Sequence, residues 1–389
     1  MKALFINKKL CAAAAIFALS FATFALDFGG SFSNFTRVKG KNFSNLKFNQ
    51  VNDLLGWIKV PLNKDGTSYF AGQALYEFEY DGSVEKVYNR LDINLAKYVN
   101  QWTVGGAPLT LSAGRFIFAD VTGIIMNQNC DGAYVTYDFP RVTVSAYAGY
   151  TGLLNAAIVK MQNHVNDRFE YKSDQVYQLA EQYLVFETGA VVPNLFSTQT
   201  LTAQFLGTFK LSSNSFNRMY LTVDMAGPIW RTIYYDASAT IGLQSYNGGS
   251  MELTGMVKGE ARYYIPFKDL AVGLGAIYAS GNKNGKNAFT GFTKIDACFS
   301  MNEMQHTSLF KIYASASIKP LKSLLARAGV GLVFNLAQDD AYQGLDMNAG
   351  VDWQIVRDAG IGATFQHFMD GKNSDNSKVQ ISLNAFLTF

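Results

Sequence analysis

The chain ends on the segment Lys378 to Phe389, which reads KVQISLNAFLTF. Apolar and polar residues alternate along it, and the apolar set is Val379, Ile381, Leu383, Ala385, Leu387 and Phe389. Such alternation predicts a β-strand with one apolar face and one polar face. The strand finishes on an aromatic residue at the end of the chain.

The opposite end has the features of a secretory signal peptide. Lys2, Lys8 and Lys9 precede an apolar run from Leu10 to Phe21, and Thr23-Phe24-Ala25 offers small residues at a cleavage site. This pattern predicts cleavage after residue 25 and a mature chain of residues 26–389 forming one domain. No later stretch of about 18 apolar residues remains, so a membrane-spanning helix is not expected.

The composition is aromatic and poor in charge. Aromatic residues make up 14% of the chain, and charged residues only 16%, against about 25% in typical soluble proteins. Removing the three signal lysines from the 33 Lys and Arg leaves 30 basic residues against 30 Asp and Glu, which is no net charge. This balance argues against a nucleic-acid partner.

Reading backward from Phe389, similar alternating segments recur with short and long connections in turn. We expect 18 strands, at 27–36, 54–60, 69–80, 87–97, 109–118, 131–139, 141–150, 181–191, 198–211, 217–227, 231–243, 251–265, 270–280, 307–319, 324–336, 345–357, 360–369 and 378–389. Residues 151–180 and 281–306 form the long connections, and 37–53, 119–130, 337–344 and 370–377 intermediate ones. Residues 292–299 also alternate, and we assign them to the long connection, above the barrel, because a nineteenth strand would separate the two ends.

An even number of antiparallel strands with short turns at one end is typical of an all-β, up-and-down transmembrane barrel. Two tandem soluble β-domains are the alternative, but the chain has no linker or change in composition between its halves.

Strand parity places charged residues on one face and apolar residues on the other. Lys or Arg on a lipid-facing surface costs about 2–4 kcal/mol at the membrane midplane, so the charged face must line a water-filled lumen. The expected lining residues are Glu77, Glu79, Arg90, Asp92, Arg115, Asp138, Glu187, Lys210, Arg218, Asp224, Asp236, Glu252, Lys258, Glu260, Arg262, Lys311 and Arg327, with Asp346 and Asp352. Opposite charges on neighbouring strands are expected to pair, and those left over would set selectivity.

Aromatic residues near strand ends are expected to form interfacial girdles. We place Tyr80, Tyr137, Tyr150, Tyr220, Tyr263 and Trp353 there.

Two features resemble bacterial outer-membrane proteins. The final strand resembles the terminal assembly signal of outer-membrane barrels, which implies that Phe389 is recognised by the barrel-assembly machinery. Residues 114–138, GRFIFADVTGIIMNQNCDGAYVTYD, resemble a hairpin of porin-like and alginate-export-type barrels, which also have 18 strands. The resemblance implies an outer-membrane location in contact with lipid and passage of small hydrophilic solutes. An alginate channel would need a strongly cationic lumen, whereas this lining is mixed and slightly acidic.

The long connections carry the remaining candidates. Residues 151–180 include Leu153, Leu154, Ile158, Val159, His164, Arg168, Glu170 and Tyr177. They predict either a plug inside the barrel or an exposed surface loop, and we favour the surface loop. Cys130 and Cys298 are candidates for a disulfide that braces two loops, the alternative being two separate thiols. No spacing of His or Cys predicts a metal site, and no cofactor is expected.

Three functions compete. The first is a channel for small hydrophilic solutes, and the second is an adhesin that displays loops 151–180 and 281–306. The third, an enzyme, is not expected, because only His164, His306 and His367 exist and no nucleophile beside a base is recognisable.

Overall fold

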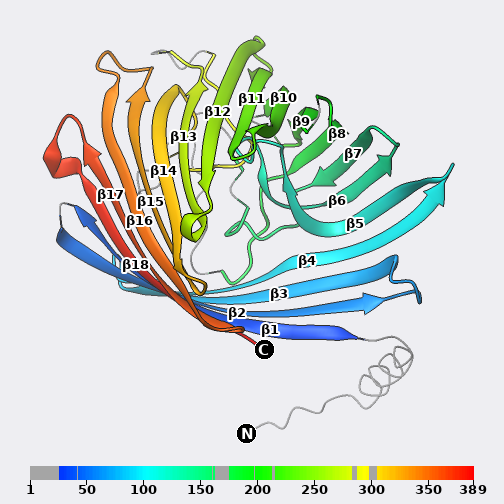
Figure 1. The fold of residues 1–389 in the computed structure, drawn as a ribbon, viewed down its shortest axis with the longest axis horizontal. Coiled ribbons are helices and arrows are strands. Elements are labelled where there is room, and N and C mark those ends of the chain that lie inside the picture. Colours follow the sequence, from blue (N-terminus) through cyan, green and yellow to red (C-terminus); the bar gives the residue numbers. More distant parts are fainter. Residues whose placement is uncertain are drawn as a thin grey trace, which may run out of the picture.

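The computed structural model describes residues 26–41, 43–159, 161–162, 175–196, 198–212, 215–282, 287–297 and 305–389. Its strands form one antiparallel sheet that curves round chain segments in its interior (Figure 1). The sheet closes on itself because β1 pairs with both β2 and β18. Within the described ranges, no helix is both long and apolar enough to cross a membrane. The predicted signal peptide lies outside the described residues.

Each strand pairs with the next along the chain. The strands are β1 (Asp27–Lys41), β2 (Ser44–Pro61), β3 (Ser68–Asp81), β4 (Lys86–Val104), β5 (Ala107–Ala119), β6 (Asn127–Asp138), β7 (Thr143–Tyr150), β8 (Tyr183–Val192), β9 (Thr200–Lys210), β10 (Phe216–Trp230), β11 (Ile233–Tyr246), β12 (Glu252–Ile265), β13 (Leu270–Ala279), β14 (Leu309–Leu321), β15 (Leu324–Asn335), β16 (Tyr342–Val356), β17 (Ala359–Asp370) and β18 (Lys378–Thr388). Two short 3₁₀ turns are η1 (Phe267–Asp269) and η2 (Ser374–Asn376).

The predicted number of strands and the alternation of their connections are confirmed. The short turns and both termini of the barrel lie at one end of it, which we call the turn end. We call the opposite end the loop end. The predicted connection 37–53 is wrong, because β1 and β2 continue as a paired hairpin through Lys41 and Ser44. Residues 292–297 form no strand in the structure, as predicted, but they fold into the barrel instead of standing above it, and Phe292 is fully buried.

The two faces of the sheet differ as the alternation predicts. On β3, Phe70, Tyr76 and Phe78 are exposed on the outer surface, while Glu77 and Glu79 lie on the opposite, inner face. Tyr263 and Trp353 are exposed outside, near the turn end, where a girdle is expected. Tyr220 was wrongly placed there, because it shares the parity of Arg218 on β10 and is buried inside the barrel.

The seam that closes the barrel depends on the last residue. Phe389 exchanges backbone hydrogen bonds with Gly30, with N···O distances of 2.8 and 2.9 Å. A Cβ on Gly30 would lie only 2.7 Å from the Phe389 ring, so glycine is required for this close approach. The Phe389 ring is exposed on the outer surface beside β1.

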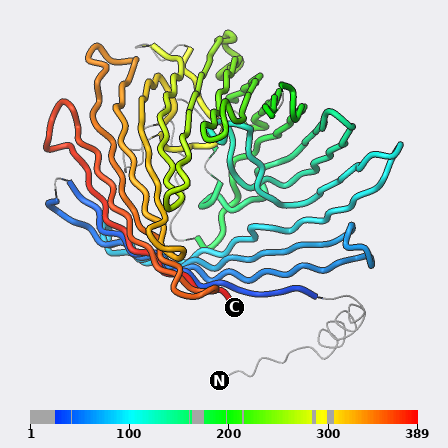
Figure 2. The backbone as a smooth tube through the Cα atoms, in the orientation of Figure 1, coloured from blue at the N-terminus to red at the C-terminus, as the bar shows by residue number. Residues whose placement is uncertain are grey.

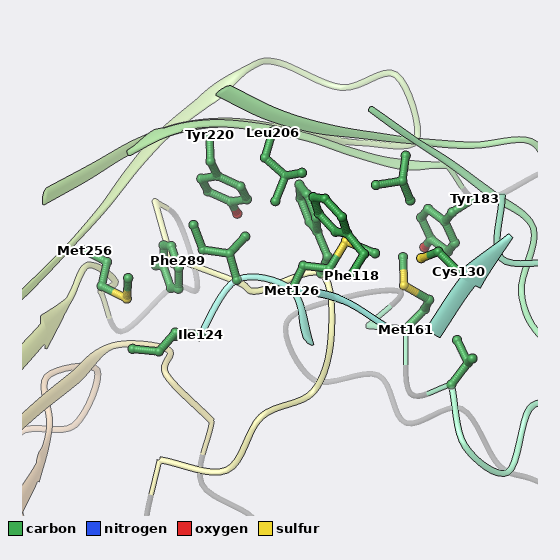
Figure 3. Packing of buried hydrophobic residues seen from close by; sticks show 14 of the residues in the cluster. Phe118, Ile124, Met126, Cys130, Met161, Tyr183, Leu206, Tyr220, Met256 and Phe289 are labelled. Carbon is green, nitrogen blue, oxygen red and sulfur yellow. The ribbon is translucent and has the colours of Figure 1, made fainter. Parts of the chain in front are cut away.

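The hydrophobic core lies inside the barrel, on one side of it. Apolar side chains from β5–β10, β12–β15 and β17 surround residues from three connections at the loop end (Figure 3). We call the described parts of these connections the inner loops. The first is 120–126, the second is 151–162 with 175–182, and the third is 280–297 with 305–308. Figure 2 shows these segments crossing the space that the strands enclose. Part of the lumen is therefore packed with protein.

Candidate functional site

The first inner loop is shaped by a buried carboxylate. Asp120 accepts hydrogen bonds from the backbone N–H of Thr122, Ile125 and Met126 at 2.7–2.9 Å, and from the Thr122 hydroxyl. Burial raises the pKa of Asp120, and these hydrogen bonds oppose the rise. The carboxylate thereby turns Ile124, Ile125 and Met126 into the core. Sequence reasoning missed Asp120, although Asp-x-Thr-Gly is a recognisable turn signal.

The third inner loop is anchored by β10 and β11. The guanidinium of Arg218 is completely buried, donates to the carbonyl of Gly291 at 2.6 Å and lies over the ring of Phe292 at 5.0 Å. The Tyr220 hydroxyl donates to the carbonyl of Thr290 at 2.7 Å. Long polar side chains of the wall thus satisfy the backbone of a loop that would otherwise be buried without partners.

The three inner loops also bind one another. The Phe292 amide donates to the carbonyl of Ile125 at 2.6 Å, and the Gln162 amide donates to the carbonyl of Phe292 at 2.8 Å. Thr293 donates to the Gln128 side chain at 3.0 Å. The loops therefore form one packed unit across part of the barrel.

A buried ion pair ties the third loop to the opposite wall. Lys311 on β14 lies 2.9 Å from Asp346 on β16, and it also donates to the carbonyl of Ala297 at 2.8 Å. Both side chains are almost completely buried. Nearby, His306 contacts the carbonyl of Ile295 through Nδ1 at 3.2 Å, and burial lowers its pKa to about 4.

The second inner loop does not project from the surface, so the favoured surface-loop prediction is wrong for its described part. Leu154, Ala156 and Val159 are buried in the core, because Asn155 and its neighbours form a bridge with the returning arm at Leu179. His164, Arg168 and Glu170 lie outside the described residues.

A cavity of about 610 Å³ separates this loop from the wall formed by β1–β4. Its charged lining consists of Asp53, Glu77, Glu79, Asp92, Arg37 and Arg90, and its apolar lining includes Phe35 and Ile158. We call it the β1–β4 cavity. Arg90 is paired with both Glu77 and Glu79, the latter at 2.7 Å. With four acidic residues against two basic ones, the lining has an excess of negative charge.

A second, smaller cavity of about 320 Å³ lies on β12–β16 and contains Arg262 and Arg327. Here too the charges pair with neighbours, Arg262 with Glu260 at 2.5 Å and Arg327 with Asp352 at 3.1 Å. Lys258 pairs with Asp236 at 3.4 Å across β11 and β12. Most of these pairs join neighbouring strands, as the sequence predicts.

All of the predicted lining residues except Arg115 lie on the inner face of the barrel. Several of them are nevertheless covered by protein and do not border open lumen, namely Glu187, Arg218, Asp224, Lys311 and Asp346. Asp92 is also buried, but it lines the β1–β4 cavity. Asp138 accepts from Thr143, Lys210 pairs with Glu181, and Glu252 accepts from the amide of Asn287. The prediction failed for the covered residues because parity gives the face of a strand but not what packs on it.

Arg115 shares its face of β5 with the exposed Ile117, so it is not on the lumen face. It forms a bidentate ion pair with Asp131 at 2.8 and 2.9 Å, and it donates to the carbonyl of Leu153 at 2.9 Å. Alternation along β5 groups Arg115 with Leu109 and Ile117, so this prediction followed the charge of the residue and not the parity of the strand.

The structure describes only one of the two candidate cysteines. Cys130 belongs to β6 and its thiol is buried and free, whereas Cys298 lies outside the described residues. The proposed disulfide therefore stays a prediction. Within the described ranges, no group of three or more His, Cys, Asp or Glu side chains could hold a metal ion.

No family model matches this sequence, and no curated relative matches it. Solved structures do match. OpdQ of Pseudomonas aeruginosa has a TM-score of 0.66 at 12% identity, covering 93% of this chain and 99% of that one. OccK2 (OpdF) of the same organism, solved in complex with glucuronate, has a TM-score of 0.64 at 10% identity over 93% and 98%. OccAB3 of Acinetobacter baumannii has a TM-score of 0.61 at 11% identity over 93% and 99%.

These neighbours are outer-membrane porins with 18-stranded barrels. At such low identity they show that the chain has the same fold. They support the porin-like part of the predicted resemblance and give no support to the alginate-export part.

Proposed function

We propose that this protein is an outer-membrane channel through which small hydrophilic solutes diffuse. The observation that carries the proposal is a closed barrel whose polar inner face borders a cavity lined by six charged side chains. An 18-stranded barrel is wide enough to leave an aqueous path beside the inner loops. The fold shared with OpdQ, OccK2 and OccAB3 supports the same function.

In this proposal the turn end faces the periplasm and the loop end faces the outside, as is general for outer-membrane barrels. Residues 1–25 direct export and are removed. The barrel-assembly machinery recognises the last strand, and the position of Phe389 at the closing seam supports a role for this residue in assembly.

The solute path follows β1–β4, because the inner loops fill the opposite side of the lumen. Charges at the narrowest part of a path set ion selectivity. The acidic excess in the β1–β4 cavity therefore gives the channel a preference for cations. This preference is mild, because Arg90 compensates part of the charge of Glu77 and Glu79.

The alternative function, an adhesin that displays loops 151–180 and 281–306, is less well supported. The described parts of both loops pack into the barrel and bind each other, which leaves them little surface for a partner. Catalysis is not part of the proposal either, since His306 is buried in a loop and His367 lies against Phe43 and Phe365.

Single-channel recording on the mature chain in planar bilayers tests the proposal. We expect stable current steps, and a reversal potential in a KCl gradient that indicates cation preference. A folded barrel that passes no current would refute the channel and favour the display function.

A further inference from the structure

The barrel wall is split between β4 and β5. These strands pair only from Ala96–Arg115 to Val104–Ala107, so β4 from Lys86 to Leu95 has no pairing with β5. Figure 1 shows β5 and β6 curving away from β4 as they leave the turn that joins β4 and β5. Everywhere else the neighbouring strands stay paired up to their inner loops or hairpins.

Two local irregularities at the same level produce this split. The β3–β4 register shifts between Leu95 and Ile93, which leaves Asn94 as an extra residue on β4. On β5, Gly114 has a φ of 119°, and a Cβ there would lie 2.1 Å from the carbonyl oxygen of Ala96. A bulge such as the one at Asn94 bends a strand and increases its twist, and the positive φ of Gly114 changes the direction of β5, so the two strands separate here.

The split lies within the apolar band of the barrel. Trp102 is exposed near the turn end of β4. A strand rises by about 3.3 Å per residue and tilts by about 40°, so Ala96 lies roughly 15 Å above Trp102. This height is close to the middle of an apolar band about 25 Å tall. Leu91 and Ile93 on β4 and Ile117 on β5 are exposed at the rims of the split, as expected for side chains that contact lipid.

The split is filled by two arms of the second inner loop, residues 151–159 and 175–182, which we call the plug. The arms pair with each other, since Ala156 donates to the carbonyl of Gln178 at 2.7 Å and Ala180 donates to the carbonyl of Leu154 at 2.9 Å. Leu153, Val176 and Leu179 of the plug are exposed at 55%, 49% and 61%. Arg115, on the outward face of β5, binds the carbonyl of Leu153, and we infer that these apolar side chains continue the surface of the rims toward lipid.

Polar contacts hold the described arms of the plug to both rims. On the β4 side, the backbone N–H of Leu91 donates to the carbonyl of Val176 at 3.2 Å. The side-chain amide of Asn155 donates to the carbonyl of Leu91 at 3.1 Å. On the β5 side, Arg115 holds the carbonyl of Leu153 and lies 3.5 Å from the Tyr177 hydroxyl. Arg115 also lies 3.9 Å from Asp92 on β4, across the split. A regular strand pair of the same length would have a continuous ladder, whereas the plug is held by these separate contacts and by the packing of Leu154, Ala156 and Ala180 in the core.

The inner side of the plug borders the β1–β4 cavity through Ala157 and Ile158. The plug thus separates an acidic cavity with apolar patches from the lipid. We propose that the split between β4 and β5 is a lateral port, which admits cationic amphiphiles to the cavity when the plug moves aside. The cation would lie among Glu77, Glu79 and Asp53, and the tail would leave between β4 and β5. This inference rests on the proposed channel function.

A reversible lock tests the port. In a background with Cys130→Ala and Cys298→Ser, the pair Leu91→Cys and Val176→Cys joins the plug to β4 by a disulfide, because adjacent backbones place the two Cα atoms about 5 Å apart. The control lock is Leu221→Cys with Ile241→Cys, two exposed residues that face each other on β10 and β11. Heat-modifiable gel migration confirms that each variant forms the barrel.

The probes are tetramethylammonium, which is the cationic head alone, and decyltrimethylammonium, which also enters lipid. We expect both to block single-channel current in the reduced protein. Oxidation of the Leu91–Val176 lock should reduce the association rate of the tailed probe at least about fivefold, without changing that of the head alone. The control lock should change neither rate.

Other outcomes overturn the proposal. Equal association rates of the tailed probe before and after oxidation would refute the lateral port. An equal loss for both probes would show that the lock obstructs the aqueous path, and absence of block would refute the cation site. Absence of current in every variant would instead refute the channel itself. The variant Asn155→Ala, which removes contacts to β4, should have the opposite effect and accelerate block by the tailed probe.

Discussion

At the scale of single residues, the inner loops are held by charges that have no access to water. Lys311 and Asp346 form a buried pair that also binds the carbonyl of Ala297. Removing one partner of such a pair leaves an uncompensated buried charge and costs about 3–5 kcal/mol, whereas replacing both by apolar residues is often close to neutral.

We therefore expect Asp346→Ala to destabilise the packed third loop by about 3–5 kcal/mol, and Lys311→Met with Asp346→Leu to restore much of that loss. Limited proteolysis of residues 280–308 and thermal unfolding in detergent would measure both effects. Equal destabilisation by the single and the double change would show that the pair acts through shape and not through charge.

His306 makes the packing of the same loop depend on pH. Its folded pKa of about 4 lies below the ordinary histidine value of 6.5, so between these values only the displaced loop takes up a proton. Packing is then fully favourable above about pH 6.5 and weakens as the pH falls toward 4, by at most about 3 kcal/mol. Below pH 4 this contribution is flat.

We expect protease sensitivity of the 280–308 segment to increase between pH 6.5 and 4 in the native protein. The variant His306→Gln cannot titrate and should lose this dependence. A His306→Gln profile identical to that of the native protein would assign the pH effect to other groups.

At the scale of elements, alternation of apolar and polar residues was enough to predict the strands that cross the apolar band, because lipid and water select opposite residues. It failed at the loop end of β1 and β2, where Lys39, Lys41, Lys47 and Asn49 are polar without a lipid face to oppose them. It also could not show that β4 and β5 separate, since that depends on backbone geometry at Asn94 and Gly114.

Gly114 occupies a position of β5 where the backbone leaves no room for a side chain. We expect Gly114→Ala to destabilise the barrel by about 1–3 kcal/mol or more, because the left-handed backbone and the carbonyl of Ala96 both exclude a Cβ. The matched change is Gly259→Ala on β12, where a Cβ would meet no atom within 4 Å. Urea midpoints of the folded barrels would compare them, and equal midpoints would contradict a strained position at Gly114.

At the scale of the whole molecule, the sequence predicts a barrel, its strand number and most of the inward-facing charges. It does not predict that part of the lumen is filled. Apolar loop residues such as Leu154 and Phe292 are equally compatible with packing inside the barrel and with contacts to a partner outside it. The structure shows that they pack inside the barrel, because Arg218 and Tyr220 on the facing wall bind loop carbonyls.

The asymmetry that results leads to a prediction about the whole channel. Since the inner loops occupy one side, ions must pass the charged lining of the β1–β4 cavity, where four acidic side chains face two basic ones. The double change Glu77→Gln with Glu79→Gln leaves two acidic and two basic residues in the lining and removes the two carboxylates that pair with Arg90. We expect the cation-to-anion permeability ratio, obtained from reversal potentials in a KCl gradient, to fall about twofold or more.

The control is Asp340→Asn, which removes an exposed charge at the loop end without touching this cavity, and it should leave the ratio unchanged. High salt should reduce the difference between the native and the double-variant channel, because it screens the charges that cause it. A ratio that responds equally to both variants would show that surface charge, and not the cavity, determines selectivity. It would also place the solute path away from β1–β4.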